Sequence, residues 1–446
     1  MGIGLGIAIA SLGVAVIGLA SSIPYQRRQR REQARQAQER ERELAADQER
    51  QATQTLEEDA LRNFKSARKA LKHRRGALAA RAIAGQGEYR WDGSIPLLTL
   101  PGWIPSHPLP LSEVSLRLNE LTEAESEPLA SARSELLSLG YWPLDRDGLP
   151  LPRYSSAILE YDATTQLSDR PSYRLIELTC EPGPAPRHEL TFSPATYFDG
   201  IDTSEPIAHE VALREKLGSP GDGPYRTWLA NPFRLGSRAA MPGINTLTVR
   251  RSERGPHFFM HQRGADAAVS MGVFHVAPAG DFQPQIDDPA IWAADLNILS
   301  NIIREYAEEF LGIKEADGTG GCRIDYEEEP PYSELSEAYR QGSMKVFYLG
   351  TGLDPLSWKP EILTACVFDE DSFDAIFMSM VPDKIDHGTG GYLLTGKARS
   401  SRPGLKYEGI PFKDEEISKY ADPSRTLPAG VACLSLAKRW MNELLP

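Results

Sequence analysis

The sequence predicts an α/β fold, with a mixed sheet sandwiched by helices, preceded by an N-terminal transmembrane helix and a long helical stalk. Three observations lead to this prediction. An uncharged apolar segment opens the chain, a charged segment follows it, and the remaining residues alternate short strand-like and helical patterns. At 446 residues and 41% hydrophobic side chains, the chain is long enough for two or three units with a sizeable core.

The first segment, residues 2–23, contains no charged side chain. About 20 apolar residues span the hydrocarbon core of a bilayer, so we predict a transmembrane helix within residues 1–25. Four arginines follow within eight residues of its end, and positive charge stays on the cytoplasmic side. This predicts a single-pass membrane protein with its body in the cytoplasm. A cleaved signal peptide is the alternative, but no basic stretch precedes the apolar run.

Residues 26–89 are rich in Gln, Glu, Arg and Ala and contain no proline. Such a composition favours a helix, which would reach about 90 Å if it were continuous. The apolar positions do not keep the heptad spacing of a regular coiled coil. We therefore predict a charged helical stalk, compatible with bundling in a homo-oligomer.

Charge is unevenly distributed along the chain. Residues 1–90 carry 17 basic and 10 acidic side chains, whereas the remainder carries 32 and 52. An acidic body argues against a nucleic-acid-binding domain, because phosphate contacts need clustered Lys and Arg. The four cysteines show no metal-binding spacing, and Cys366 and Cys433 lie in apolar runs. They are typical of buried thiols in a reducing compartment.

Residues 90–230 read as an α+β region, either an accessory domain or an N-terminal elaboration of the following sheet. Its hydrophobic patterns predict strands at Tyr154–Tyr161 and at residues 173–180, and an amphipathic helix at residues 204–217.

Residues 231–446 form the second predicted domain. Alternating apolar patterns predict strands over residues 245–251, 257–263, 269–278, 344–350 and 362–368. A Pro-Ala-Gly turn closes the third of them at Gly280.

A helix is predicted between the third and fourth of these strands. Asp288 and Pro289 are a typical helix start, and Gly312 is a plausible stop. An apolar stripe recurs at steps of three and four residues, comprising Trp292, Leu296, Leu299, Ile303, Tyr306 and Phe310. Glu305, Glu308 and Glu309 fall on the opposite face.

Three carboxylates on one helix face can hold a hard divalent cation, because Mg²⁺ and Mn²⁺ prefer oxygen ligands. A solvated acidic surface is the alternative interpretation of the same pattern.

The run from Arg304 to Glu309, REYAEE, resembles the core of the Nudix box, the metal-binding loop and helix of Nudix hydrolases. Arg304, Glu305, Glu308 and Glu309 match this core one for one, and Gly280 would be the glycine that opens the box. The resemblance implies a Nudix-like fold for residues 231–446.

The first half of the box departs from the family pattern. In the family, five residues separate the opening glycine from a glutamate. The corresponding position in this chain is Ile286, and the nearest acids are Asp287 and Asp288. Sixteen residues separate Asp287 from Arg304, and Leu311 is an extra residue before the closing glycine. An insertion therefore stretches the box.

The resemblance implies hydrolysis of a nucleoside diphosphate linked to another group, with Mg²⁺ or Mn²⁺ as cofactor. Glu308 and Glu309 would be the main metal ligands, Glu305 a third ligand or a base, and Arg304 would orient the carboxylates. Substrate contacts would come from Gly280, Arg250, Arg251 and Arg263.

Two other functions fit the same sequence. The stretched box is compatible with a nucleotide sensor that binds its ligand without cleaving it and signals through the membrane anchor. The acidic body is also compatible with a membrane-tethered scaffold that recruits a basic partner.

Overall fold

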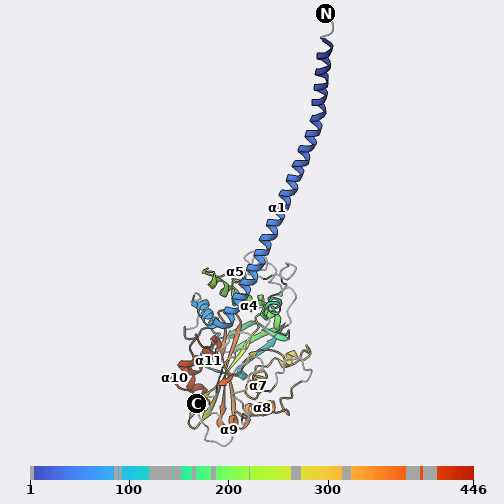
Figure 1. Cartoon of the computed structure of the whole chain (residues 1–446). Coiled ribbons are helices and arrows are strands. Elements are labelled where there is room, and N and C mark those ends of the chain that lie inside the picture. Colours follow the sequence, from blue (N-terminus) through green and yellow to red (C-terminus); the bar gives the residue numbers. More distant parts are fainter. Residues whose placement is uncertain are drawn as a thin grey trace. The chain divides into compact units, whose positions relative to one another are not determined.

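The structure is a computed structural model, traced in Figure 1. It describes residues 5–84, 89, 93–119, 143, 151, 153–162, 167–181, 187–219, 221–262, 273–313, 323–377, 392–394 and 409–445. The chain divides into two compact units, Met1–Ala60 and Leu61–Pro446.

Residues 5–60 of the first unit belong to α1 (Leu5–Ala84), which continues into the second unit and is kinked at Arg74. Its described side chains between residues 28 and 48 are exposed, and many are Arg, Glu or Gln. The exposed pair Arg35 and Glu39, four residues apart, gives only weak local support.

The prediction of a transmembrane helix at residues 2–23 was wrong, and so were the membrane-anchored part of the fold class and the single-pass location with a cytoplasmic body. Of the helices in the described part of the chain, none combines the length and the apolar character that crossing a bilayer requires. Residues 1–4 and the side chains of residues 5–27 lie outside the described part.

The second unit combines helices with three sheets. Within the described residues, the largest sheet has seven strands in the order β1-β10-β11-β5-β6-β13, with β9 beside β5. They are β1 (Leu109–Pro110), β5 (Gly243–Ser252), β6 (Gly255–Phe258), β9 (Ala279–Asp281), β10 (Met344–Leu353), β11 (Pro360–Asp369) and β13 (Ile410–Pro411). Strands β5 and β11 are parallel, and both are buried along most of their length. Because both faces of these strands are buried, their apolar residues follow one another in nearly continuous runs.

Two helices cover opposite faces of this sheet (Figure 1). The helix α7 (Ile298–Glu309) packs on one face, where Tyr306 and Thr248 share a hydrogen bond of 2.7 Å. On the other face, Cys433 of α11 (Pro428–Arg439) donates to the backbone oxygen of Asn245. Buried residues accordingly form two hydrophobic clusters.

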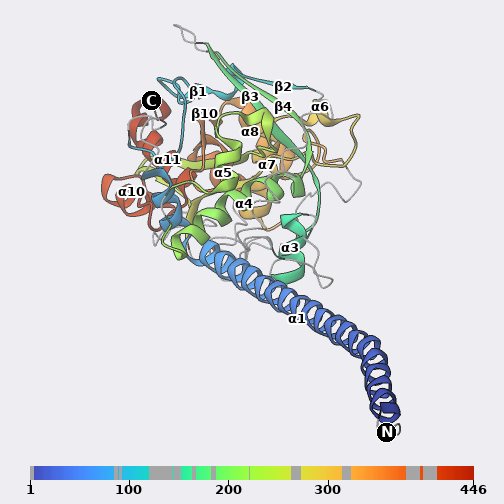
Figure 2. The same ribbon diagram turned by 90° about the horizontal axis from the view of Figure 1, so that it is seen from above.

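The other two sheets are smaller. One contains β7 (Met260–Gln262), β8 (Phe274–Val276) and β12 (Tyr392–Leu394), and the other β2 (Val114–Leu118), β3 (Pro171–Glu181) and β4 (Arg187–Thr196). Figure 2 shows β2, β3 and β4 side by side. The main hydrophobic cluster includes side chains from both residues 90–230 and residues 231–446.

The remaining helices and helical turns lie around these sheets. They are η2 (Leu111–Glu113), α3 (Tyr154–Tyr161), α4 (Tyr197–Lys216), α5 (Pro224–Leu229), η4 (Leu235–Ser237), α6 (Trp292–Asp295), α8 (Tyr332–Gln341), α9 (Glu370–Ile376), α10 (Asp414–Tyr420) and α12 (Met441–Leu444).

Two predictions of local structure were wrong. Tyr154–Tyr161 forms the helix α3 rather than a strand, because Tyr154, Ala157 and Ile158 lie on one face and are buried together. The helix predicted to begin at Asp288 is interrupted after α6, and α7 begins anew with Asn297 as its N-cap. The side chain of Asn297 accepts a hydrogen bond from the backbone of Ser300.

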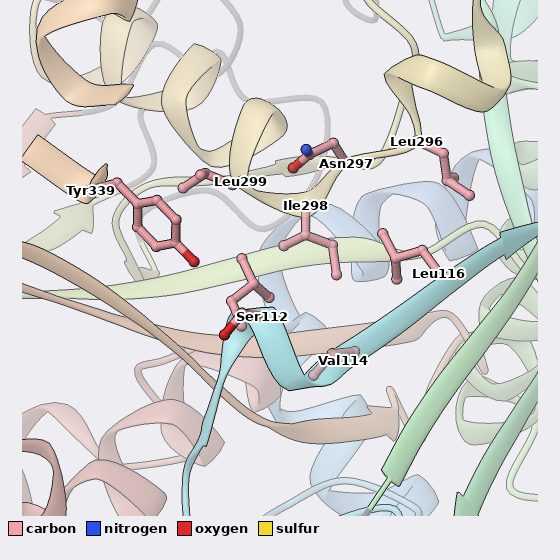
Figure 3. A pocket seen from close by; sticks show the side chains of 9 residues that line it. Ser112, Val114, Leu116, Leu296, Asn297, Ile298, Leu299 and Tyr339 are labelled. Carbon is pink, nitrogen blue, oxygen red and sulfur yellow. The ribbon is translucent and has the colours of Figure 1, made fainter. Parts of the chain in front are cut away.

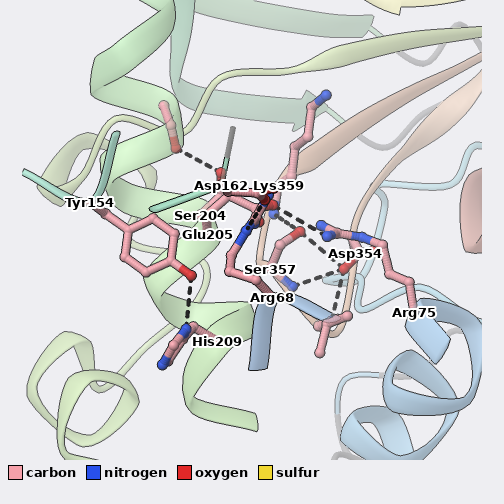
Figure 4. Close-up of polar contacts among 12 residues, drawn as sticks. Arg68, Arg75, Tyr154, Asp162, Ser204, Glu205, His209, Asp354, Ser357 and Lys359 are labelled. Carbon is pink, nitrogen blue, oxygen red and sulfur yellow. Dashed lines mark hydrogen bonds and ion pairs between the residues drawn. The ribbon is translucent and has the colours of Figure 1, made fainter. Parts of the chain in front are cut away.

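The last turns of α1 pack against α4 within the second unit (Figure 4). Phe64 and Leu71 are fully buried, and the ring of Phe64 stacks on that of His209 at 5.6 Å. The hydroxyl of Tyr154 shares a 2.8 Å hydrogen bond with Nδ1 of the same histidine. The step of seven residues places Phe64 and Leu71 on one helical face, and this face enters the core.

Buried ion pairs accompany this packing. Arg68 bridges to Glu205 at 2.6 Å and to Asp162 at 3.3 Å, while Arg75 reaches Glu205 at 3.2 Å and Lys72 reaches Asp162 at 2.7 Å. Burial alone would raise the pKa of Glu205, but Arg75 and Arg68 lower it below its ordinary value. Glu205 therefore joins α4 to α1 as a carboxylate.

We expect Glu205→Gln to lower the free energy of unfolding by about 3–5 kcal/mol at pH 7, because it leaves buried guanidinium charge uncompensated. Urea unfolding measures this. Since the pKa of Glu205 is lowered, its contribution is present above the unfolded value near 4.5 and declines as the pH falls through the folded value.

The matched control is Glu189→Gln, which removes a half-exposed partner of Arg117. We expect a loss of less than about 1 kcal/mol there. Equal losses in the two variants would contradict the structural role given to Glu205.

Candidate functional site

The acidic residues of the candidate box lie in the second half of α7, directly beside β9. Gly280, in the middle of β9, is the closest point of approach: a Cβ at this position would lie 1.9 Å from Oε1 of Glu305. Only a residue without a side chain lets the carboxylate rest against the strand in this way. The structure therefore brings together the opening glycine and the first box glutamate, despite the insertion between them.

Glu309, one turn further along α7, contacts the neighbouring residue of the same strand. The backbone N–H of Ala279 donates to Oε1 of Glu309 at 3.1 Å. Asn301 lies one turn before Glu305 and donates to its Oε1 at 3.5 Å. Glu305 and Glu309 thus follow the backbone of β9 as a pair of half-buried carboxylates.

Glu308 lies on α7 between the other two box glutamates and near α8. Burial raises the pKa of Tyr332 in α8, and the nearby charges of Glu329 and Glu308 raise it further. At about 100° per residue, Glu308 lies about 60° from Glu305 and about 100° from Glu309 around the helix axis.

Arg304 is buried and bonded to the inserted loop. Its Nη2 donates to the backbone oxygen of Gln283 at 2.6 Å and to Oδ1 of Asn301 at 3.0 Å, and its Nη1 donates to the hydroxyl of Tyr326 at 3.0 Å. Burial alone would lower the pKa of Arg304, but the interactions with Tyr326 and Asp295 raise this pKa above its ordinary value. Arg304 stays charged and fastens the segment after β9 to α7.

The insertion is a folded element of the site. Asp295 accepts hydrogen bonds from both the backbone and the side chain of Gln285, and lies 3.9 Å from Arg304. The side-chain oxygen of Gln285 accepts from the backbone of Ile324. Asp288 caps the backbone of Ala290 at the outer end of the loop. Asp295, which lay outside the sequence prediction, thus pairs with the box arginine.

The arginines predicted to contact phosphate lie elsewhere. Arg250 is 2% exposed at its side chain and is held by two acids of α9, Asp374 at 2.7 Å and Glu370 at 2.9 Å. Arg251 is partly exposed and pairs with Asp369. Arg263 lies outside the residues that the structure describes. Within the described residues, the hydrogen bonds of Arg250 and Arg251 run to Asp369, Glu370 and Asp374 rather than to α7 or β9.

A second polar cluster occupies the other face of the β9–β5 pair. Lys359 crosses over Gly243, where a Cβ would lie 3.3 Å from its Nζ, and reaches Asp281 at 2.6 Å. Glu361 lies against the same glycine and accepts from Asn245 at 2.8 Å. Sequence reasoning missed these residues, although Asp281 directly follows Gly280.

Glu361 has an altered protonation equilibrium. Burial raises its pKa to about 7, and Lys359 and Asn245 offset this only in part. Asn245 in turn is bonded to Nε2 of His275 at 2.8 Å. Glu361 is therefore able to exchange a proton near neutral pH.

The side chains at β9 have the chemistry that a hard cation prefers, because Glu305 at Gly280 and Glu309 at Ala279 both carry carboxylate oxygens. In the part of the chain that the structure describes, no group of three or more acidic, His or Cys side chains adopts a metal-binding arrangement. A cation held by Glu305 and Glu309 alone would need further oxygen ligands, such as those of a bound phosphate group, to complete its coordination.

A pocket of about 250 Å³ lies at the opposite end of α7 (Figure 3). It is lined by Leu111, Ser112, Val114, Leu116, Leu296, Asn297, Ile298, Leu299 and Tyr339. Ile298 and Glu309 are 11 positions apart, about 16 Å along a helix. The pocket is therefore distinct from the acidic pair.

Comparison with known proteins gives no relative for this chain. No protein-family model matches the sequence, and no curated protein matches it. The Nudix resemblance stays a prediction that rests on the box residues.

We expect Gly280→Ala to displace the Glu305 carboxylate and to weaken Mn²⁺ binding about tenfold, while the free energy of unfolding falls by no more than about 1 kcal/mol. The stability cost is small because the end of a flexible side chain can move. Calorimetric titration with Mn²⁺ measures the affinity. Gly236→Ala is the control, since its Cβ meets only the Ile176 oxygen at 3.8 Å. Unchanged Mn²⁺ affinity in Gly280→Ala would contradict the role of this contact.

The raised pKa of Glu361 predicts a pH dependence of stability. The folded protein holds this proton more tightly than the unfolded chain, so the contribution is fully present below pH 4.5 and is lost as the pH rises to about 7. We expect Glu361→Gln to abolish this loss. The melting temperature of the variant should therefore rise relative to that of the wild type as the pH increases from 4.5 to 7. Parallel pH profiles for the two proteins would refute the assignment.

Proposed function

We propose that this protein is a Nudix-type pyrophosphohydrolase, which cleaves a nucleoside diphosphate linked to another group with the help of Mg²⁺ or Mn²⁺. The observation that carries this proposal is the contact between Gly280 and Glu305. These residues are 25 positions apart, and the insertion lies between them, yet the carboxylate rests against the glycine. The parts of the box that the resemblance pairs are adjacent in space.

Each residue of the box has a distinct role in this proposal. Glu305 and Glu309 hold the cation, which neutralises pyrophosphate charge and lowers the pKa of an attacking water. Arg304 acts at a distance from the reaction: it fixes the inserted loop and so keeps β9 against α7. Glu308, whose charge acts on Tyr332 of α8, has the lesser role in this proposal.

A second candidate is a sensor that binds the nucleotide without cleaving it. It is favoured by the hydrogen bond from Ala279 to Glu309, because a carboxylate engaged by the backbone is a weaker metal ligand. Within the described residues, no group of three possible metal ligands is found. Two carboxylates fit nucleotide binding better than nucleotide cleavage.

Hydrolysis is tested with the full-length protein and a panel of nucleoside diphosphate compounds, with Mg²⁺ or Mn²⁺, and products are read by mass spectrometry. We expect cleavage, and we expect Glu309→Gln to lower kcat/KM by about 100-fold or more through lost charge stabilisation. Glu308→Gln should cost clearly less.

Glu334→Gln, an exposed carboxylate on α8, is the control and should retain wild-type activity. If no compound is cleaved but one of them raises the melting temperature of the wild type and not of Glu309→Gln, the protein is a sensor. Cleavage that is equal in wild type and Glu309→Gln would place the activity outside this site.

A further inference from the structure

Two buried arginines lie around the turn that joins β10 to β11. Arg226 belongs to α5 and Arg238 follows η4, and they are 3% and 2% exposed. Both donate to backbone oxygens of residues 355–358 in this turn. A buried guanidinium is costly unless an anion or a full set of acceptors compensates it.

Arg238 has much of its hydrogen-bonding capacity unused. Its Nη2 donates to the oxygens of Pro232 at 3.0 Å and Trp358 at 2.7 Å. Its Nε and Nη1 find no acceptor among the described residues, and no described acidic side chain forms a salt bridge with it. Burial lowers the pKa of Arg238 to about 10, so it remains a cation at neutral pH.

Further donors occur at the same turn. Nη2 of Arg226 donates to the oxygens of Pro355 and Leu356, and its guanidinium lies 4.9 Å from the ring centroid of Trp358. In the described part of the chain, neither Nε of Arg226 nor Nε1 of Trp358 has an acceptor. Nη1 of Arg226 lies 3.8 Å from the half-exposed carboxylate of Asp222, so Arg238 is the cation of this group without a described acidic partner.

The nearest buried carboxylates are already occupied by the backbone. Glu210 accepts from the N–H groups of Tyr225 and Arg226 at 2.9 and 3.0 Å. Asp354 accepts from the backbone of Leu356 and from Ser357. These bonds hold α5 and the turn in place, but they leave the spare donors of Arg238 uncompensated.

Trp358 also has an uncommon backbone conformation, with φ of +55°. Left-handed conformations are rare for large side chains and persist where the surroundings hold them. Here the turn is held by Asp354 and by the two arginines, and the indole is kept beside Arg226.

We propose that Arg238, Arg226 and Trp358 form a binding site for a small inorganic anion of the size of chloride. The spare groups are all donors, and an anion bound at Arg238 would supply the acceptor and the counter-charge that this guanidinium lacks among the described residues. The enclosure sets the size: side chains that are 2–3% exposed leave no access for a nucleotide. The site is therefore structural and independent of the proposed hydrolase site.

Chloride linkage tests this proposal in the full-length protein. Melting temperature is measured from 0.1 to 100 mM chloride, with gluconate holding the ionic strength constant. Above the dissociation constant, we expect each tenfold increase in chloride to raise the midpoint by about 1–3 °C. A midpoint independent of chloride over this range would overturn the proposal.

Two variants locate the effect. Trp358→Phe removes the indole N–H with little loss of volume and should weaken the chloride dependence, and Arg238→Met should abolish it. Arg340→Met is the control, because Arg340 is a half-exposed arginine on α8 and should keep the full dependence. Equal chloride dependence in Trp358→Phe and wild type would place the anion elsewhere.

Bromide gives a direct test that needs no variant. In crystals of the wild type soaked in bromide, we expect an anomalous peak within hydrogen-bonding distance of Nε or Nη1 of Arg238. Water molecules alone at these atoms, without an anomalous peak, would mean that solvent satisfies the donors, and the anion site would be refuted.

Discussion

The buried guanidinium of Arg304 is the constraint on which the candidate site depends. It joins three separate segments: α7 itself, the loop after β9 through Gln283, and Tyr326 beyond the helix. Because this charge is buried, its partners must stay in place. They hold β9 against α7, and this closeness puts Glu305 on Gly280 and Glu309 on Ala279. The insertion therefore lengthens the box without separating its two halves.

The helix α4 connects the surroundings of this site with α1. Its first residue is Tyr197. Burial raises the pKa of Tyr197, and the nearby charge of Asp281, next to Gly280, raises it further. Two turns later, Glu205 and His209 hold Arg68 and Phe64 of α1. The helix α4 thus begins near Asp281 and holds the end of the long helix. The buried ion pairs give this junction a defined geometry, because neither partner can leave without exposing an uncompensated charge.

The sequence was informative where the pattern is local. The acidic face of α7 and the apolar runs of β5 and β11 follow from periodicity alone. Periodicity misled at Tyr154–Tyr161, where three buried residues at helical spacing lie in a segment that also suits a strand. The apolar run at residues 2–23 suggested a bilayer span, and the described helices do not bear this out.

Long-range partners could not be predicted, because nothing local encodes them. Asp295 joins Arg304 through a loop that matches no motif, and Lys359 reaches Asp281 across Gly243 from the turn before β11. The α9 acids around Arg250 are likewise more than 100 residues away. Such contacts depend on the order of strands in the sheet, which periodicity does not determine.

The most direct test of the central claim is a crystal structure of the wild type with Mn²⁺ and a non-hydrolysable nucleoside diphosphate analogue. The account predicts an anomalous manganese peak bounded by the carboxylates of Glu305 and Glu309, beside Gly280, with a phosphate oxygen among its ligands. Manganese bound elsewhere, or no peak at this position under saturating metal, would contradict the assignment of a metal-dependent site to α7 and β9.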